Sequence, residues 1–237
     1  MPASALASND RPAEPSSASS LASTGLVLPP WMQAANWQHQ SFPGKRRTNY
    51  KAQKFQGRDA LMAEANASMS VVRKKRRIAA QDLGRVKFSW AAQELMVKAD
   101  IAQRDAEDAK LRVVLVFEGD RSRFSAKNQM LSDLSQALTG EELPYATLMY
   151  VWSNQHPVGS VVHNPRTDRI RKMVVESGGM HLGQWREYER DISADFERAF
   201  GEKPGALLGV ALMTDSDNTQ SRIKAWYGSL QFASIKP

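Results

Sequence analysis

The chain contains 237 residues, of which 42% are hydrophobic, so it is long enough for one large domain or two small ones. Its 32 lysine and arginine residues against 25 acidic ones give a formal net charge of +7, which favours nucleic acid, anionic lipid or acidic polysaccharide without distinguishing among them. The absence of cysteine excludes disulfides, thiolate zinc sites and cysteine nucleophiles. The four histidines lack the spacing of a helical zinc site, and no apolar run approaches the roughly 20 residues that span a bilayer.

The first segment, residues 1–29, is rich in serine, alanine and proline and poor in large apolar side chains. Such a composition buries too little surface to offset the entropy of ordering, so it predicts a disordered leader followed by a single domain over residues 30–237. The segment shows neither the cationic start nor the apolar run of about 7–15 residues that marks a signal peptide.

Short segments rich in β-branched and aromatic residues recur between turn signals from Tyr50 onward, a rhythm typical of a β-sandwich or barrel. The alternation is clearest in VKFSWAAQ, where Val86, Phe88 and Trp90 would share one face. Strands are predicted over residues 49–55, 60–67, 68–76, 86–93, 111–118, 146–152, 170–177, 185–191, 207–214 and 223–232.

Two short helices interrupt the predicted strands, and we expect them to cover edges or corners of the sheets. SADFERAFG begins at a capping residue, Ser193, and ends at Gly201. SAKNQMLSDLSQAL has apolar residues at helical spacing, namely Met130, Leu131, Leu134 and Leu138. The expected fold class is therefore all-β, a jelly-roll-like antiparallel β-sandwich with two short helices.

Three long motifs follow one another with short spacers: PYATLMYVWSNQHPVGSVVHNPRTDRIRKMVVESG, HLGQWREYERDISADFERAFGEKP and LLGVALMTDSDNTQSRIKAWYGSLQF. Together with SFPGKRRTNY and VKFSWAAQE upstream, they resemble the bacterial domain-of-unknown-function family 3047 (DUF3047) over about residues 40–233. The resemblance implies a jelly-roll-like sandwich and an exported protein, periplasmic or secreted, and it brings no activity with it. The chain departs from the family's frequent YGD by reading Tyr227-Gly228-Ser229.

Residues 214–219 form a carboxylate-rich turn between the last two predicted strands. Asp215, Asp217 and Asn218 offer the hard oxygen ligands that calcium prefers, although the glycine and distal glutamate of an EF-hand loop are missing. Asp and Asn side chains also hold turns through hydrogen bonds to the backbone. A calcium site and a purely structural turn both stay open at this point.

Aromatic residues on separate strands would stack on sugar rings if they line a cleft, and would otherwise fill the core. Trp152 and Trp226 lie beside polar loops, so we expect these two to be exposed. The full aromatic set is Trp90, Tyr150, Trp152, Trp185, Trp226 and Tyr227. The predicted ligand-binding residues are Trp152, Asp215, Asp217, Asn218, Trp226 and Tyr227.

The strongest basic cluster is VVRKKRR, residues 71–77. A short run of this kind is also found in nucleic-acid-binding segments. In an extended strand, however, neighbouring side chains point to opposite faces, so five successive cations do not all follow one phosphate chain. We therefore favour a solvated edge strand, with contact to an anionic polymer as the alternative and nucleic acid as an unlikely partner.

Acid–base catalysis requires two titratable groups that converge on one bond. If the protein is an enzyme, Glu176 and Asp215 are the predicted acid and base, and Arg112 neutralises substrate charge. Such an enzyme would be a hydrolase or lyase acting on an acidic polysaccharide.

The function favoured by the sequence is a non-catalytic binding module for a carbohydrate or another polymer of the bacterial cell envelope. The aromatic set, the basic charge and the sandwich pattern support it. The acidic-polysaccharide hydrolase or lyase is the second hypothesis. A structural or assembly protein that binds a partner chain at a sheet edge is the third.

Overall fold

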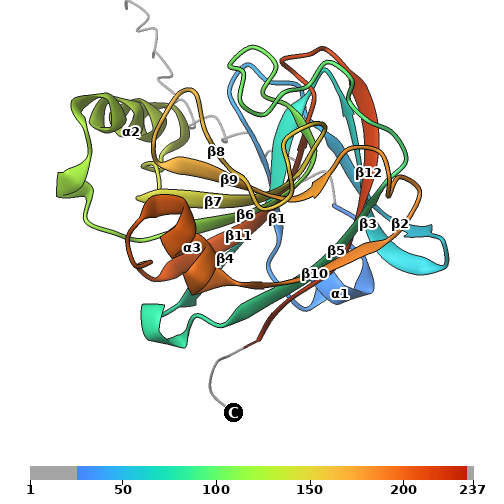
Figure 1. Ribbon diagram of the computed structural model, residues 1–237, viewed down its shortest axis with the longest axis horizontal. Coiled ribbons are helices and arrows are strands. Elements are labelled where there is room, and N and C mark those ends of the chain that lie inside the picture. The colour runs from blue at the N-terminus through green and yellow to red at the C-terminus, as the bar shows by residue number, and fades with distance from the viewer. Residues whose placement is uncertain (1–25, 234–237) are drawn as a thin grey trace, which may run out of the picture.

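The structure, a computed structural model, describes residues 26–233 and contains two β-sheets that enclose a common core (Figure 1). The seven-stranded sheet has the order β1 (Gln38–Ser41), β4 (Met69–Ile78), β11 (Leu207–Asp215), β6 (Ala109–Phe117), β7 (Ala146–Ser153), β9 (Ile170–Ser177), β8 (Val161–His163). The five-stranded sheet has the order β10 (Arg186–Asp191), β5 (Arg85–Ala92), β12 (Arg222–Ala233), β3 (Arg58–Asn66), β2 (Asn49–Phe55). The expected all-β sandwich is confirmed.

All of the predicted strands form, and the structure adds two short ones, β1 and β8. Both were missed because each is only three or four residues long and β1 consists of the polar sequence QHQS. Their neighbours define them, since β1 pairs with residues 70–73 of β4 and β8 with residues 171–173 of β9. The strand pairs of residues 26–233 are antiparallel apart from β7 and β9, which run parallel.

The core lies between the sheets, and alternation places its side chains there. Val86, Phe88 and Trp90 of β5 are buried in it as predicted, and Phe88 stacks on Tyr150 of the opposite sheet with ring centroids 5.5 Å apart. A second apolar cluster covers the outer face of the seven-stranded sheet, where the loop residue Ile101 packs among strand residues. The seven-stranded sheet is therefore buried on both faces over part of its area.

The helix α2 (Ala126–Thr139) has the predicted bounds to within one residue, but its apolar side faces solvent. Met130, Leu134 and Leu138 are 53–62% exposed, and the buried positions are Asn128 and Ser132. Asn128 binds the following loops through Asp168 and Thr167, so polar contacts dock the helix. The apolar residues at helical spacing therefore do not form the buried side of this helix.

The helix α3 (Ile192–Phe200) packs Ile192 and Phe196 into the core and ends at Gly201, whose positive φ of 72° suits glycine. Its capping residue is Asp191 instead of the predicted Ser193, because the Asp191 carboxylate accepts a hydrogen bond from Ala194 N–H at 3.0 Å. The helix therefore begins two residues earlier than the sequence suggested.

We expect the variant Asp191→Ala to lose about 1 kcal/mol of unfolding free energy, because it removes the cap of α3. The matched variant Ser193→Ala is expected to change stability by less than about 0.5 kcal/mol. Urea unfolding of both variants measures the difference. Equal effects of the two substitutions would show that Asp191 does not act as the cap.

The shortest α-helix, α1 (Pro30–Gln33), is anchored by Met32, which is fully buried in the core. Leu26 and Leu28, which lie in the segment assigned to the leader, also pack against the core. The remainder of that leader, residues 1–25, lies outside the described residues.

The two 3₁₀ turns are η1 (Ala80–Asp82) and η2 (Arg121–Arg123). No helix of residues 26–233 has the length and apolar character to cross a membrane.

Candidate functional site

The carboxylate-rich turn does not present Asp215 to solvent. Asp215 ends β11 and is 2% exposed, and it pairs with the guanidinium of Arg112 on β6 at 2.8 Å. Its other oxygen accepts a hydrogen bond from Ala109 N–H at 2.9 Å. Burial raises the pKa of Asp215 to about 7, since desolvation and the neighbouring Asp108 carboxylate oppose the attraction of Arg112.

The rest of the turn is tied down by Asp108, which is fully buried. Its carboxylate accepts hydrogen bonds from the backbone N–H groups of Asn218 and Thr219 at 3.2 and 2.7 Å, and from the Thr219 hydroxyl at 2.6 Å. The Asn218 amide donates to the Glu107 carbonyl at 3.3 Å, and Asp217 pairs with Lys45. These contacts are those of a structural turn.

Two further charges complete this buried network. Lys172 on β9 is fully buried and pairs with Glu107 at 2.7 Å. Burial lowers the pKa of Lys172 to about 8, although the Glu107 carboxylate opposes that shift. Arg112 also lies close to Glu107, whose carbonyl accepts from it at 3.0 Å. The network therefore balances carboxylates with cations inside the fold.

One oxygen from each of Asp108, Asp215 and Asp217 lies within 4.8 Å of the others, so these three residues form a group that could hold a cation. Asn218, included in the predicted calcium site, contributes its amide and backbone N–H groups to hydrogen bonds instead. The carboxylates of Asp215 and Asp217 already face Arg112 and Lys45. A cation would have to compete with both, so the geometry favours the structural interpretation of the turn.

The aromatic residues expected beside the turn are buried. Trp152 is 1% and Trp226 4% exposed, so the expectation that these two face solvent is wrong. Phe55 stacks on the Trp226 ring at 4.0 Å between centroids and covers it. Trp152 donates to the Gly178 carbonyl at 3.0 Å, and Tyr227 donates to the Met213 carbonyl at 2.6 Å from within the core. These residues stabilise the sandwich.

The two carboxylates proposed as an acid–base pair do not meet. Asp215 lies on β11 and Glu176 on β9, with β6 and β7 between them. Three strand spacings of about 4.8 Å separate the backbones by roughly 14 Å. Their partners also differ, because Glu176 contacts Tyr188 of the other sheet whereas Asp215 belongs to the network around Arg112. With separate partners, the two carboxylates do not flank one bond as the paired carboxylates of a glycosidase do.

Both oxygens of Glu176 are engaged at the edge between the sheets. One accepts from Tyr188 and Arg186 at 2.8 and 3.0 Å, and the other faces His181 and Ser177 N–H at 3.1 Å each. Burial raises the pKa of Glu176, but hydrogen bonds from Tyr188 and His181 outweigh it and hold the pKa below its usual value. Glu176 is therefore a poor proton donor.

A serine–histidine contact elsewhere is also unsuited to catalysis. His39 Nε2 lies 2.8 Å from the Ser70 hydroxyl, and Arg47 donates to His39 Nδ1 at 2.8 Å. Because Nδ1 accepts, the ring proton sits on Nε2 and is donated to Ser70, so the histidine cannot take the serine proton. Burial and the charge of Arg47 lower the pKa of His39 to about 4, which keeps the ring neutral.

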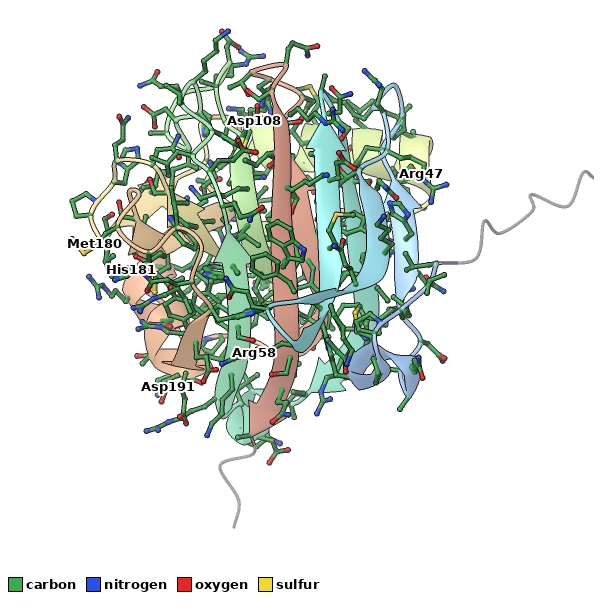
Figure 2. All side chains as sticks on the ribbon, turned by 90° about the vertical axis from the view of Figure 1, so that its right-hand side faces the viewer. Arg47, Arg58, Asp108, Met180, His181 and Asp191 are labelled. Atoms are coloured by element: carbon green, nitrogen blue, oxygen red, sulfur yellow. The ribbon has the colours of Figure 1, made fainter. Side chains whose placement is uncertain are left out.

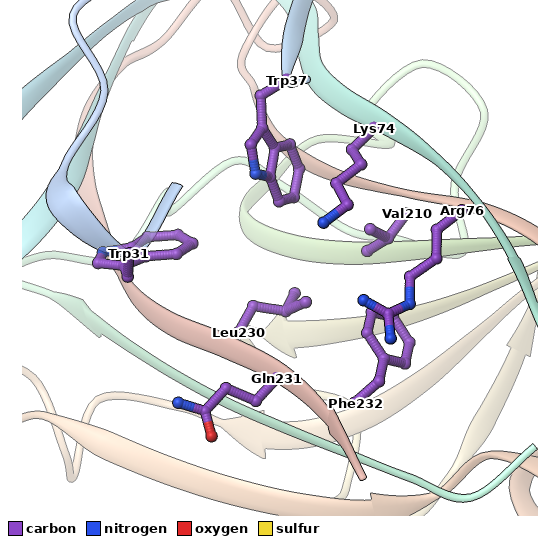
Figure 3. A pocket seen from close by; sticks show the side chains of 8 residues that line it. All are labelled: Trp31, Trp37, Lys74, Arg76, Val210, Leu230, Gln231 and Phe232. Atoms are coloured by element: carbon purple, nitrogen blue, oxygen red, sulfur yellow. The ribbon is translucent and has the colours of Figure 1, made fainter. Parts of the chain in front are cut away.

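A pocket of about 350 Å³ opens beside the first residue of β1. Beyond that point the second half of β4 is paired only with β11. Figure 3 shows Lys74 and Arg76 extending from β4 toward it, with Trp37 opposite Lys74 and Phe232 beside Arg76. Its lining consists of Trp31, Trp37, Lys74, Arg76, Val210, Leu230, Gln231 and Phe232. Aromatic rings, cations and one amide thus surround a single hollow.

The pocket differs from a larger hollow of about 530 Å³ on the five-stranded sheet. There the charges neutralise one another, since Arg58 pairs with Glu187 at 2.7 Å and Lys87 with Glu189 at 3.3 Å. In Figure 2, Arg58 lies on that face, and Asp108 lies near the top of the molecule, where β12 begins. The first pocket contains the other end of β12, Leu230–Phe232, so it is remote from the turn that the sequence singled out.

The aromatic residues of the pocket were not among those predicted to bind ligand. Trp31 and Trp37 precede the first predicted strand, and Trp31 Nε1 is buried without a hydrogen-bond partner among the described residues. The sequence did contain a feature that could have identified them, because Trp31 and Trp37 lie outside the predicted strands and so are not explained as strand residues of the core. The cations of residues 71–77 were identified, but their division between two faces was not assigned.

Comparisons with solved structures find β-sandwiches of low similarity. The family 11 carbohydrate-binding module of a cellulosomal cellulase from Clostridium thermocellum matches with 8% identity over 88% of this chain and 94% of that chain, at a TM-score of 0.42. The xyloglucanase domain of a type three effector from Sinorhizobium fredii matches with 8% identity, coverage of 84% and 92%, and a TM-score of 0.43. The family 11 xylanase from Neocallimastix patriciarum shows 12% identity, coverage of 84% and 100%, and a TM-score of 0.39.

A search of curated proteins found none that matches the sequence. A protein family does match, over residues 35–231, and it is described as a protein of unknown function, DUF3047. The match covers most of the chain and includes the strands of both sheets except the last two residues of β12, whereas Trp31 and Phe232 of the pocket lie just outside it. The chain therefore belongs to the DUF3047 family.

Proposed function

We propose that the protein is a non-catalytic binding module that takes a carbohydrate chain at the pocket lined by Trp31, Trp37 and Phe232. The observation that carries this proposal is the pocket itself, where ring surfaces lie beside polar groups at an opening of the sandwich. Sugar rings present apolar C–H faces to aromatic rings and hydroxyl groups to donors and acceptors. A volume of about 350 Å³ lies in the range of ligand pockets.

Rigid elements support the pocket. Met32 anchors α1 in the core and so holds Trp31, and Trp37 stands next to β1, which is paired with β4. Phe232 and Gln231 belong to β12, which is paired with β5 at this point. A ligand would meet side chains that are already ordered, which reduces the entropy lost on binding.

Binding is favoured over hydrolysis because the lining contains no carboxylate among the described residues. A glycosidase needs two such groups on either side of the bond it breaks. Glu176 and Asp215, the residues considered for that role, lie outside the lining. A polymer of the cell envelope would be met in the periplasm or outside the cell, the location that the family resemblance implied.

Affinity electrophoresis in gels that contain neutral or acidic polysaccharides tests the proposal. We expect the protein to be retarded by at least one polymer, and Trp37→Ala to weaken that binding about tenfold, as for an aromatic residue at the centre of a binding site. Trp185→Ala, which changes a tryptophan outside the pocket, is the matched control and is expected to keep its affinity. Absence of retardation by every polymer, or equal losses in the two variants, would contradict the proposal.

A further inference from the structure

The cations of residues 71–77 divide into two rows because β4 is extended. Arg73, Lys75 and Arg77 point away from the pocket, and each has an acidic partner. Arg73 pairs with Glu141 through both terminal nitrogens at 2.5 and 2.8 Å, Lys75 lies 3.5 Å from Glu141, and Arg77 lies 2.7 Å from Glu118. Two carboxylates, Glu141 and Glu118, therefore offset most of the charge of this outward row and leave one positive charge.

The inward row consists of Lys74 and Arg76, and it lines the pocket. Neither residue forms an ion pair with a carboxylate within residues 26–233. Their neighbours are aromatic instead, since the Lys74 ammonium lies 5.9 Å from the centre of the Trp37 ring and the Arg76 guanidinium 4.9 Å from the centre of the Phe232 ring. Two positive charges thus stand side by side in the pocket without an acidic counterpart (Figure 3).

The local electrostatics follow from this arrangement. Burial and the neighbouring Arg76 charge lower the pKa of Lys74. An anion between the two side chains would relieve their repulsion, and a carboxylate suits the planar guanidinium because it accepts two parallel N–H donors.

From this pairing we infer that the carbohydrate bound in the pocket is an acidic one, a chain containing uronic acid residues whose carboxylate lies between Lys74 and Arg76. This inference rests on the proposed function and specifies its ligand. The sugar ring that carries the carboxylate stacks on Trp37 or Phe232.

A nucleic acid also offers anions and stacking surfaces, but the outward row argues against it. A single strand requires a groove with a run of cations that follows successive phosphates. On β4 the cations beyond Lys74 and Arg76 face the opposite side and are held by Glu141 and Glu118. The pocket therefore suits one carboxylate on a sugar ring better than a chain of phosphates.

The test uses three polysaccharides that contain uronic acid residues, polygalacturonate, alginate and hyaluronate, which are here all called polyuronates. Each is compared with its carboxyl-reduced form, which keeps the sugar chain and loses the charge. Isothermal calorimetry is carried out on the full chain. We expect at least one polyuronate to bind about tenfold or more tightly than its reduced form, because a charge-assisted hydrogen bond to a carboxylate is lost in the latter.

Variants locate the effect. The double variant Lys74→Gln/Arg76→Gln is expected to lose about tenfold or more in affinity for the polyuronate and little for the reduced polymer. The double variant Lys75→Gln/Arg77→Gln removes the same charge from the same strand on the other face, and it is expected to stay within about twofold of the unmodified protein. Melting temperatures confirm that both variants fold.

The outcomes separate the two proposals. Equal binding of charged and reduced polymers, with loss in Trp37→Ala, would leave the carbohydrate module standing and overturn the acidic ligand. Equal losses in the two double variants would also overturn it, since the attraction would then come from net charge. Failure of all six polymers to bind, or displacement of a bound polyuronate by a single-stranded oligonucleotide at equal charge concentration, would overturn the acidic-sugar site.

Discussion

Replacing Arg112 with methionine is expected to lower the free energy of unfolding by about 3–5 kcal/mol, because it leaves a buried carboxylate without its partner. Arg112 is 2% exposed and stands between Asp215 and Glu107, so the group that it neutralises lies away from bulk solvent. Urea unfolding at neutral pH measures the loss, with the slope of the transition as a check on two-state behaviour.

Two further variants show whether burial is the cause. Arg77→Met breaks an exposed ion pair with Glu118 and is expected to change stability by less than about 1 kcal/mol. Adding Asp215→Asn to Arg112→Met removes the buried carboxyl group that lost its partner and is expected to recover part of the lost stability. If Arg112→Met proves no worse than Arg77→Met, the buried network does not hold the turn.

The second large effect concerns Lys110, a lysine with 1% exposure. Its ammonium lies 5.1 Å from the centre of the Trp152 ring and 3.3 Å from the Asn154 side-chain oxygen. Burial lowers the pKa of Lys110 to about 7, although the Glu176 charge opposes that shift. The folded protein therefore holds a charged lysine in an apolar setting at any pH below about 7.

The sign of the resulting pH dependence follows from proton binding. Between pH 7 and 10.5 the unfolded chain keeps the proton on Lys110 and the folded chain releases it, so this residue makes stability rise with pH across that window. Below the window the full penalty applies, and above it the penalty is absent. A pKa lowered from 10.5 to about 7 corresponds to a penalty of roughly 3–5 kcal/mol.

The variant Lys110→Met is therefore expected to have its largest advantage in unfolding free energy over the unmodified protein near pH 6. By pH 10.5 this difference in unfolding free energy should have fallen by roughly 3–5 kcal/mol. Urea unfolding of both proteins at intervals across this range gives the difference directly. The exposed lysine variant Lys87→Met serves as the control, and its difference should stay flat with pH. A flat difference for Lys110→Met as well would mean that Lys110 is already neutral or solvated when folded.

Much of the sandwich could be predicted from local patterns. Strands such as β9 and β2 were placed to the residue, because their β-branched and aromatic content is bounded by turn residues. Which side of α2 faces the protein could not be predicted in this way. Its leucines have ideal spacing, but Asn128 fixes its orientation through contacts with residues about forty positions away, a distance indicated by neither periodicity nor composition.

The site was predicted less well for a related reason. Trp226 was expected to be exposed because it follows a polar turn, yet Phe55 reaches across from β2 and stacks on it. For the basic run the sequence does indicate two rows of cations, since alternation alone separates Lys74 from Lys75. The sequence does not indicate that carboxylates lie on only one face of β4. Glu118 and Glu141 belong to later segments of the chain, and only the fold brings them beside this strand.

The strand order has a consequence for how the chain acquires its fold. β11 lies between β4 and β6, and β12 lies between β5 and β3, so the last two strands are central in both sheets. Until residues 207–233 have been synthesised, each sheet consists of two separate groups of strands with unpaired inner edges. The two sheets cannot enclose the core before these strands are added. Closure of both sheets must therefore wait for nearly the whole described chain, and until then the inner strand edges are open to pairing with other chains.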